Sequence, residues 1–358
     1  MALMIITGLL CGAALGFVLQ RGRFCLTGGF RDMYLAKDNR MFYALLLAIA
    51  IQSVGVYALI QYGLLQYEAG TFSWVAVVLG SFIFGIGIVL AGGCATGTWY
   101  RAAEGLIGSW IALIFYMITS AIMKSGVLLP ANERLSSIQV HNNSIPATFG
   151  LNVWVFIVIL VAIVAIIMIK EARKPKVVIP SLKPKKTGIA HLLFERRWNP
   201  FFTASLVGVI AIIAWPLSEA TGRNAGLGVT TPSANIVQYL VIGDKSYLNW
   251  GVFLVLGIFI GSFIAAKASN EFRLRVPDVK TIVSSLFGGI FMGIGASLAG
   301  GCTIGNGLVS TAMMTWQGWI SLAFMILGVW TASYFVFVRP RVKKQAVAKR
   351  AVSPASSH

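Results

Sequence analysis

The stretch Leu90-Ala91-Gly92-Gly93-Cys94 occurs a second time as Leu298-Ala299-Gly300-Gly301-Cys302. The likeness extends beyond this phrase, because residues 80–97 align without a gap on residues 288–305 and ten of the 18 positions are identical. Gly97 and Gly305 close the aligned segments. Each copy lies between two long apolar runs. A glycine-rich turn that ends in cysteine therefore stands twice between predicted membrane spans.

The composition is that of a membrane protein. Hydrophobic residues make up 57% of the chain and charged residues only 11%, with a mean hydropathy of +0.81. Several uncharged runs approach the roughly 20 residues with which a helix crosses a bilayer. The first has its arginines after it, so we interpret it as a retained span rather than a secretory signal. We expect an all-α polytopic membrane protein with short re-entrant helices and nine transmembrane helices, at residues 4–20, 41–63, 72–91, 105–123, 151–169, 201–217, 249–266, 281–299 and 316–338.

Positive charge is distributed unevenly along the chain, whose net charge is +18. With the N-terminus outside, the inner segments hold 25 Lys and Arg residues and the outer segments hold four. Because cytoplasmic loops carry the excess of Lys and Arg, we expect an outside N-terminus and a cytoplasmic C-terminus. Binding of nucleic acid is the weaker interpretation, since no soluble fold is available to present a basic face.

The two copies of the turn predict an inverted internal repeat. An odd number of crossings separates them, so they should face opposite ways. Inverted repeats are typical of transporters, in which the substrate path lies near the middle of the membrane between the repeats. The expected units are a first repeat with four spans and two non-spanning segments, a connecting span with a basic linker, a second, inverted repeat, and a basic tail, at residues 1–126, 127–200, 201–338 and 339–358.

The repeated turn has the chemistry of an anion site. Gly92-Gly93 and Gly300-Gly301 allow a sharp turn and a close approach of the main chain to a ligand. If a short helix begins just after each turn, its free N–H groups and positive dipole end point toward whatever lies beside Cys94 or Cys302. Non-helical backbone is tolerated at membrane depth only where it is buried in protein or lines a wet cavity.

Other residues of these segments have two competing interpretations. Cys25 lies in another glycine-rich, non-spanning segment, where Arg21 and Arg23 either attract an anion or only set the topology. Cys11 lies inside the first span and is interpreted as a core residue. Gly85 and Gly87 are explained at least as well by helix packing as by a functional role.

The thiols admit several roles. The spacing does not demand a disulfide between the two repeat cysteines. A soft-metal site would lack a second type of ligand within the spans, because the three histidines lie in loops or the tail. A dithiol oxidoreductase usually brings a CxxC pair, which is absent. Contact with a sulfur-bearing anion in a pore remains, since S–H is a weak donor on a polarizable sulfur and conduction requires weak, multiple sites.

Three phrases in the same order resemble those of the YeeE/YedE sulphur-transport family, most closely of its bacterial thiosulfate-uptake members of the YeeE type. They are Arg21-Gly22-Arg23-Phe24-Cys25, Leu90-Ala91-Gly92-Gly93-Cys94 and Ala299-Gly300-Gly301-Cys302. The resemblance runs from Met1 to about Arg341 and implies an hourglass-shaped importer of thiosulfate in the bacterial inner membrane. It also implies that Cys25, Cys94 and Cys302 pass the ion along by S–H to sulfur hydrogen bonds. No cofactor is implied, but a small cytoplasmic sulfur-carrier protein of the TusA/SirA-like type is an expected partner, docking on the linker and the inner basic loops.

The resulting hypothesis is a transporter rather than an enzyme. The alternatives are a membrane thiol enzyme or sulfurtransferase that cleaves the S–S bond, and a transporter of another sulfur species or of a soft metal. Cys94 and Cys302 are expected to make the central contacts, with Cys25 near the inner end of the path. The full predicted site comprises Cys25, Cys94, Cys302, Gly92, Gly93, Gly97, Gly300, Gly301, Gly305, Arg21 and Arg23.

Overall fold

The computed structural model describes residues 1–174, 188, 191–196 and 198–342. The expected basic linker at 170–200 and the expected tail at 339–358 therefore lie partly outside the described residues. Within these residues the secondary structure is helical, and the β-type pairings are isolated bridges such as that between Phe72 and Val140. The expected all-α fold is confirmed.

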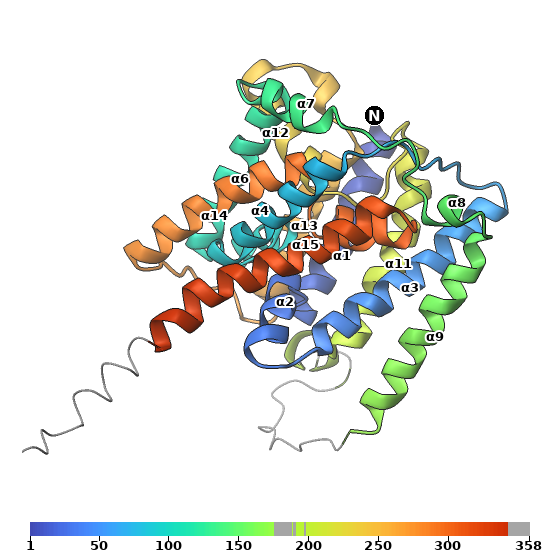
Figure 1. The fold of residues 1–358 in the computed structure, drawn as a ribbon. Coiled ribbons are helices and arrows are strands. Elements are labelled where there is room, and N and C mark those ends of the chain that lie inside the picture. The colour runs from blue at the N-terminus through green and yellow to red at the C-terminus, as the bar shows by residue number, and fades with distance from the viewer. Residues whose placement is uncertain (175–187, 189–190, 197, 343–358) are drawn as a thin grey trace, which may run out of the picture.

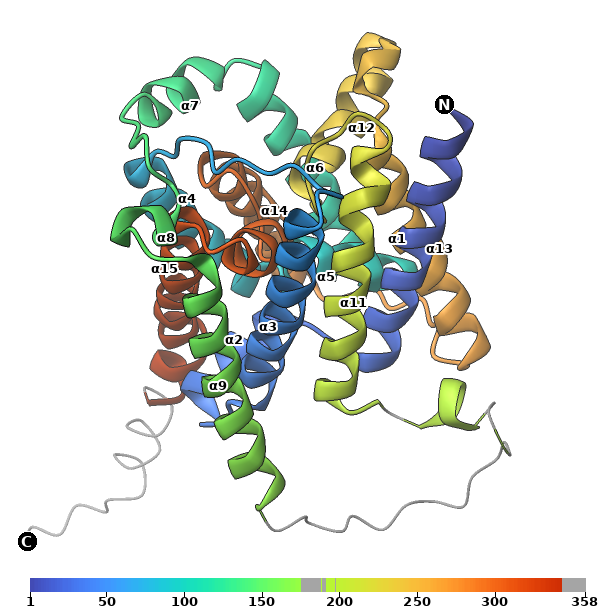
Figure 2. The same cartoon turned by 90° about the vertical axis from the view of Figure 1, so that its right-hand side faces the viewer.

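Nine of the described helices are long and apolar enough to cross a membrane. They are α1 (Ala2–Gly22), α3 (Arg40–Gln61), α4 (Trp74–Leu90), α6 (Ile107–Ser125), α9 (Val153–Ala172), α11 (Pro200–Glu219), α13 (Trp250–Ala268), α14 (Val279–Leu298) and α15 (Trp316–Ser333). Each matches one predicted span, so the nine-span prediction is confirmed. The N-terminus lies at one end of the bundle, and the last turns of α9 and α15 lie at the other (Figures 1 and 2).

Four short helices stand between the spans at the segments that the sequence leaves as non-spanning. They are α2 (Leu26–Leu35), α5 (Ala95–Ala103), α12 (Thr230–Ile242) and the π-helix η3 (Gly305–Ser310). None is as long as the roughly 20 residues that a crossing needs. The other short elements lie in connections: α7 (Leu129–Ser136), α8 (Ile145–Phe149), η1 (His191–Glu195), η2 (Lys245–Tyr247) and η4 (Tyr334–Val338).

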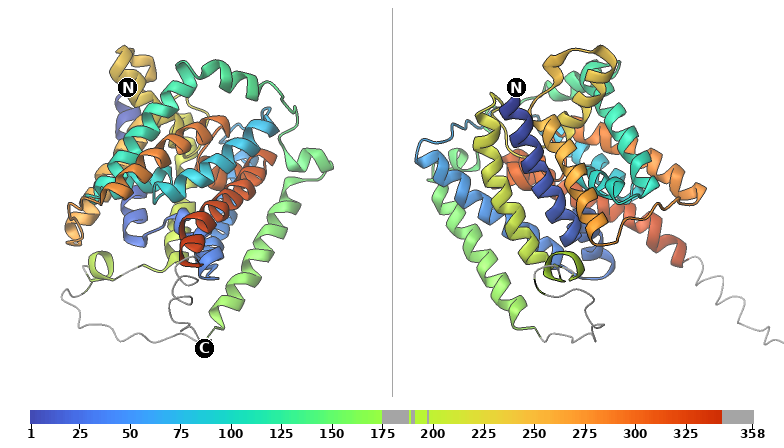
Figure 3. Two further views of the ribbon diagram at one scale, coloured as in Figure 1. Left: turned by 60° about the vertical axis from the view of Figure 1, so that its left-hand side comes forward. Right: turned by 180° about the vertical axis from the view of Figure 1, so that it is seen from behind.

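Helices at equivalent positions of the two halves of the chain make equivalent contacts with the other half. Helix α1 packs against α13, and α11 packs against α3. In the same way α6 packs against α14 and α4 against α15, while α12 contacts α6 and α2 contacts α15. Helix α9 lies at the edge of the bundle beside α3 (Figures 2 and 3). This exchange of partners is what two related halves joined by a connecting span predict.

Small residues allow the central helices to pack at very short distance. A β-carbon on Gly12 of α1 would collide with the backbone of α13, and one on Gly257 of α13 would collide with α1. Gly85 faces the backbone of α15 and Gly87 that of α14 in the same manner. The packing interpretation of Gly85 and Gly87 is confirmed, and Cys11 is a buried residue of α1 as expected.

Candidate functional site

The first repeat turn follows the end of α4 at Leu90. Gly92 has a φ of 69°, a left-handed conformation that a side chain would strain. Cys94 is the N-cap of α5, and its sulfur accepts a hydrogen bond from the backbone nitrogen of Gly97 at 3.3 Å. Arg101, in the last turn of α5, donates to the carbonyl oxygen of Gly92. The short helix expected after this turn is present, and its N-terminus lies at the thiol.

The second repeat turn has the same backbone reversal but a different support. Gly300 has a φ of 72°, and Cys302 is fully buried. The carbonyl oxygen of Cys302 accepts a hydrogen bond from the backbone nitrogen of Asn306 at 2.8 Å. A β-carbon on Gly301 would lie only 2.8 Å from the Asn306 side-chain oxygen, which also accepts from Gln317 at 3.2 Å. The amides of buried Asn306 and half-buried Gln317 thus support this turn where an arginine supports the first, and the helix that follows is the π-helix η3.

The third cysteine also caps a short helix. Cys25 is the N-cap of α2, and its backbone is extended. Arg23, two residues earlier, ends α1 in the left-handed conformation with a φ of 46°. The reversal between α1 and α2 therefore presents the Cys25 side chain and the free N–H groups of α2 to the interior. The sequence predicted a non-spanning segment here but no helix beginning at this cysteine.

Two of the three cysteines converge on one glycine. The Cys25 and Cys94 sulfurs lie 3.5 and 3.3 Å from the position that a β-carbon on Gly97 would take. All four cysteines of the chain are free thiols, so the disulfide interpretation gains no support. Cys25 and Cys302 line different cavities. The sequence made Cys94 and Cys302 the central contacts, whereas the structure places Cys25 directly beside Cys94.

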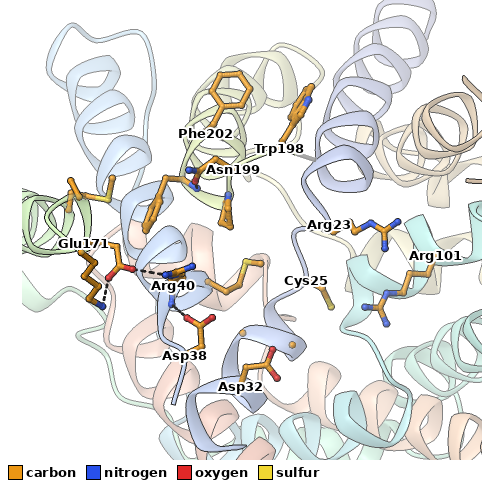
Figure 4. A pocket seen from close by; sticks show the side chains of 18 residues that line it. Arg23, Cys25, Asp32, Asp38, Arg40, Arg101, Glu171, Trp198, Asn199 and Phe202 are labelled. Atoms are coloured by element: carbon orange, nitrogen blue, oxygen red, sulfur yellow. Dashed lines mark hydrogen bonds and ion pairs between the residues drawn. The ribbon is translucent and has the colours of Figure 1, made fainter. Parts of the chain in front are cut away.

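A cavity of about 1160 Å³ opens beside Cys25; we call it the Cys25 cavity. Its wall carries both signs of charge, from Arg23, Asp32, Asp38, Arg40, Arg101, Glu171 and Lys174. Glu171 is paired with Arg40 at 3.0 Å and with Lys174 at 2.6 Å. Figure 4 shows the Cys25 thiol on the same side of the cavity as Arg101, away from this ion pair. The cations on the thiol's side of the cavity are therefore Arg23 and Arg101.

A smaller cavity of about 280 Å³ is lined by Cys302; we call it the Cys302 cavity. The charged residue of its wall is Arg223. The Nη1 atom of Arg223 donates hydrogen bonds of 2.9 Å to Ser218 Oγ and to the carbonyl oxygens of Ala225 and Gly226. Burial lowers the pKa of Arg223 to about 10, so the guanidinium stays protonated at neutral pH. Gly300, Gly301 and Gly305 line the same cavity. From the sequence, Arg223 was only one of the four basic residues in the segments predicted to lie on the outer side of the membrane.

The two cavities lie toward opposite ends of one spanning helix. Pro200, the first residue of α11, lines the Cys25 cavity, and Trp215, near the end of α11, lines the Cys302 cavity. Cys94 lines neither cavity. It is 3% exposed and is contacted from one side by Cys25 and from the other by the hydroxyl of Thr303, the neighbour of Cys302. Cys94 thus occupies the closed segment between the cavities.

The two predicted arginines have different surroundings. The Arg21 side chain is 2% exposed and is bound by Glu271 at 3.4 Å and by the carbonyl oxygens of Leu193 and Arg196 at 2.7 and 3.2 Å. The Arg23 side chain is 57% exposed, contacts Glu271 at 3.4 Å and lines the Cys25 cavity. Arg23 therefore stays at the site, whereas the guanidinium of Arg21 fastens α1 to neighbouring segments.

In the part of the chain that the structure describes, nine apolar helices surround buried thiols, with a cavity toward each end of α11. This arrangement defines a polytopic helical membrane protein of the kind that moves small solutes. Residues 21–331 match the protein family described as sulphur transport. The chain belongs to this sulphur-transport family, and the resemblance seen in the three cysteine phrases is confirmed.

Individual relatives cover nearly the whole chain. The thiosulfate transporter TsuA of Escherichia coli strain K12 is 66% identical over 340 residues, which is 95% of this chain and 97% of that protein. The thiosulfate transporter TsuA of Spirochaeta thermophila is 33% identical over 350 residues, or 94% and 100% of the two chains. A probable transporter, YedE of Escherichia coli, is 34% identical over 117 residues, or 32% and 28%. These relatives are transporters and not enzymes.

Residues that the sequence did not single out complete the site. Tyr116 is fully buried near both Cys94 and Cys302, and its hydroxyl group is 3.0 Å from the hydroxyl oxygen of Thr230. Thr303 faces Cys94 from the second half of the chain. The signals that could have found them are modest: Thr303 follows the second repeat cysteine directly, and Tyr116 is a tyrosine within an otherwise apolar span.

Proposed function

We propose that this chain transports thiosulfate across a membrane, from the Cys302 cavity past Cys94 to the Cys25 cavity. The observation that carries the proposal is the convergence of the Cys25 and Cys94 sulfurs beside Gly97, at the closed segment between the two cavities. Relatives that are named thiosulfate transporters and match nearly the full chain support the choice of ion.

The chemistry of the path suits a sulfur-bearing dianion that must move on after each contact. Neutral thiols donate weakly through S–H, so Cys302, Cys94 and Cys25 can each hold the terminal sulfur without trapping it. Positive charge stands on both sides, with Arg223 in one cavity and Arg101 in the other. The helix N-termini at Cys25 and Cys94 add partial positive charge.

The glycines of the site keep bulky side chains away from the thiols. At Gly97 a β-carbon would press on the Cys94 sulfur and touch that of Cys25, and at Gly305 the space is open. Gly92 and Gly300 supply the left-handed turns. Gly93 and Gly301 continue those turns up to the cysteines. The proposed path thus includes the predicted site glycines Gly92, Gly93, Gly97, Gly300, Gly301 and Gly305.

The organisation we propose is an hourglass built from two inverted repeats, residues 1–126 and 201–338, joined by a connecting span and linker at 127–200 and followed by the tail at 339–358. The exchange of helix partners between the halves supports this division. The charge bias supports an outside N-terminus and a cytoplasmic C-terminus in a bacterial inner membrane. The Cys25 cavity then faces the cytoplasm, and transport is import.

A cytoplasmic sulfur-carrier protein of the TusA/SirA-like type is the partner that we propose for the released ion. The face around the Cys25 cavity offers the needed contacts, because a second hollow of about 460 Å³ beside it has a net positive lining. The arginines Arg23, Arg101, Arg273 and Arg275 outnumber the carboxylates Glu104 and Glu271 there. Such a cationic rim would attract an acidic surface of a carrier at close range. The linker part of the expected docking region falls largely outside the described residues.

Uptake of radiolabelled thiosulfate into proteoliposomes that contain only the purified chain tests the proposal. Accumulation of intact thiosulfate supports transport by a thiol relay. Release of sulfite by the purified protein, without accumulation of the intact ion, would instead indicate that the thiols cleave the S–S bond. A second label on the sulfonate sulfur separates the two outcomes, because only intact transport brings both sulfurs into the vesicle together.

A further inference from the structure

Thr303 carries a buried hydroxyl that pairs with no oxygen or nitrogen atom of the described residues. The residue follows Cys302 directly and is fully buried, and its hydroxyl lies beside the Cys94 sulfur without a hydrogen bond of ordinary geometry. Other buried hydroxyls near the three turns differ in this respect. Those of Thr27, Thr96 and Ser297 also lack a partner among the described residues, whereas that of Tyr116 is paired with Thr230 and that of Thr311 donates to carbonyl oxygens at 2.9 and 3.0 Å. An unpaired buried hydroxyl lowers stability, so its presence calls for a reason.

The unpaired hydroxyl lies where a passing ion has to go. It faces the sulfur of Cys94, in the closed segment that neither cavity reaches. Its neighbour Cys302 lines the Cys302 cavity. Thr303 therefore stands between the thiol that an ion meets in that cavity and the thiol that it meets next.

The two repeats differ at this position. The gap-free alignment places Ala95 opposite Thr303, so the first repeat has a methyl group where the second has a hydroxyl. Ala95 is fully buried. Since packing in the first repeat needs no hydroxyl here, the general architecture of the turn does not explain Thr303.

We propose that Thr303 is a selectivity residue, whose hydroxyl donates a hydrogen bond to a sulfonate oxygen of thiosulfate while Cys94 contacts the terminal sulfur. This inference rests on the proposed function. Thiosulfate presents a polarizable sulfur at one end and oxygens at the other, and an S–H beside an O–H matches the two ends. A hydrogen bond from a hydroxyl to an anionic oxygen is stronger than one between neutral groups. The bond is made while the ion is in the closed segment and is broken when it moves on.

The test compares Thr303→Val, which keeps the shape and removes the hydroxyl, with Thr303→Ser, which restores it. Thr311→Val is the matched control, because it removes a buried hydroxyl that is already bonded within its own helix. Each full-length variant is purified, its melting temperature is measured, and the concentration dependence of thiosulfate uptake is followed in proteoliposomes. Sulfate is added as a competitor to report selectivity.

Thr303→Val should lower Vmax/KM for thiosulfate by about tenfold or more, the effect of losing one hydrogen bond to a charged group. Its melting temperature should equal or exceed that of the parent, because an unpaired buried hydroxyl has been removed. Thr303→Ser should recover uptake to within about threefold of the parent. Thr311→Val should lower the melting temperature while keeping Vmax/KM within about the same factor.

Parental uptake by Thr303→Val would overturn the inference. So would a lowered melting temperature in Thr303→Val together with failure of Thr303→Ser to restore uptake, because the hydroxyl would then be structural. The proposed function fails separately, if the parent chain does not accumulate thiosulfate or if Cys94→Ala accumulates it at the parental rate.

Discussion

The sulfur atoms of Cys25 and Cys94 lie on either side of the space above Gly97, at 3.5 and 3.3 Å from the point where a β-carbon on that glycine would sit. The two cysteines are 69 positions apart in the chain and belong to the N-caps of different short helices, α2 and α5. Their meeting brings two thiol sulfurs and two helix N-termini to one point. In the proposed path this point is the transfer from Cys94 to the Cys25 cavity.

Gly97→Ala should impair transport without unfolding the protein. A methyl group at this position would press on the Cys94 sulfur at 3.3 Å, a contact at which the neighbour must give way, and would meet the Cys25 sulfur in ordinary contact at 3.5 Å. We expect the uptake rate in proteoliposomes to fall by about tenfold, with a change in unfolding free energy of about 1 kcal/mol or less. Gly307→Ala is the control, because its β-carbon would make only an ordinary contact of 3.7 Å with Leu322. Equal uptake by the two variants would contradict the proposed role of Gly97.

Oxidative cross-linking should join Cys25 to Cys94 and leave Cys302 free. A mild oxidant removes two electrons and two protons from the thiol pair, and disulfide geometry is reachable only for cysteines that are already close. Peptide mapping should find the Cys25–Cys94 bridge, and uptake should stop until a reductant restores it. The Cys11→Ala background should behave in the same way, since Cys11 lies in the core of α1. A dominant bridge that includes Cys302 would show that the cysteines are arranged differently.

Arg101 should support both the first turn and the anion. Its guanidinium donates to the Gly92 carbonyl and lies beside Cys25 at the cavity wall. Arg101→Gln should cost about 1–2 kcal/mol of stability and reduce uptake strongly, while Arg101→Lys should keep part of the uptake because the charge remains. Arg134→Gln is the control, since Arg134 is exposed on α7. Uptake by Arg101→Gln at the rate of this control would argue against a role in anion passage.

Substitution of Arg21 and substitution of Arg23 should change the melting temperature by different amounts. Arg21 is almost fully buried and binds Glu271 and two carbonyl oxygens, so Arg21→Gln leaves these acceptors unpaired and should lower the melting temperature by several degrees. Arg23 is 57% exposed, and Arg23→Gln should change the melting temperature little but weaken uptake at low thiosulfate concentration. Loss of stability in Arg23→Gln alone would reverse these assignments.

The spans could be predicted because hydropathy and helix length are local properties of the sequence. The predicted span at 105–123 is α6 at Ile107–Ser125, and α12 at Thr230–Ile242 lies in a segment between two predicted spans. The turns at Gly92 and Gly300 could be predicted as well, since paired glycines before a helix permit a left-handed residue.

The neighbours of the thiols could not be predicted, because they depend on how distant segments pack. Cys25 is the N-cap of α2, which packs against α3 and α15, and Cys94 is the N-cap of α5, which packs against α6 and α13. The contact between the two cysteines therefore depends on the packing of several helices. Arg21 is paired with Glu271, which lies 250 positions later in the chain. The hydroxyl of Thr303 meets Cys94 across the interface between the two halves. A single sequence contains each of these residues but not their tertiary contacts.

Radiolabelled thiosulfate uptake by Cys94→Ala, beside the parent and Cys11→Ala in proteoliposomes, tests the central claim most directly. Cys94 is the thiol in the closed segment between the cavities, so its loss should abolish uptake while the protein stays folded, with a melting temperature close to that of Cys11→Ala. Parental uptake by Cys94→Ala would show that the ion crosses the membrane without the thiol relay.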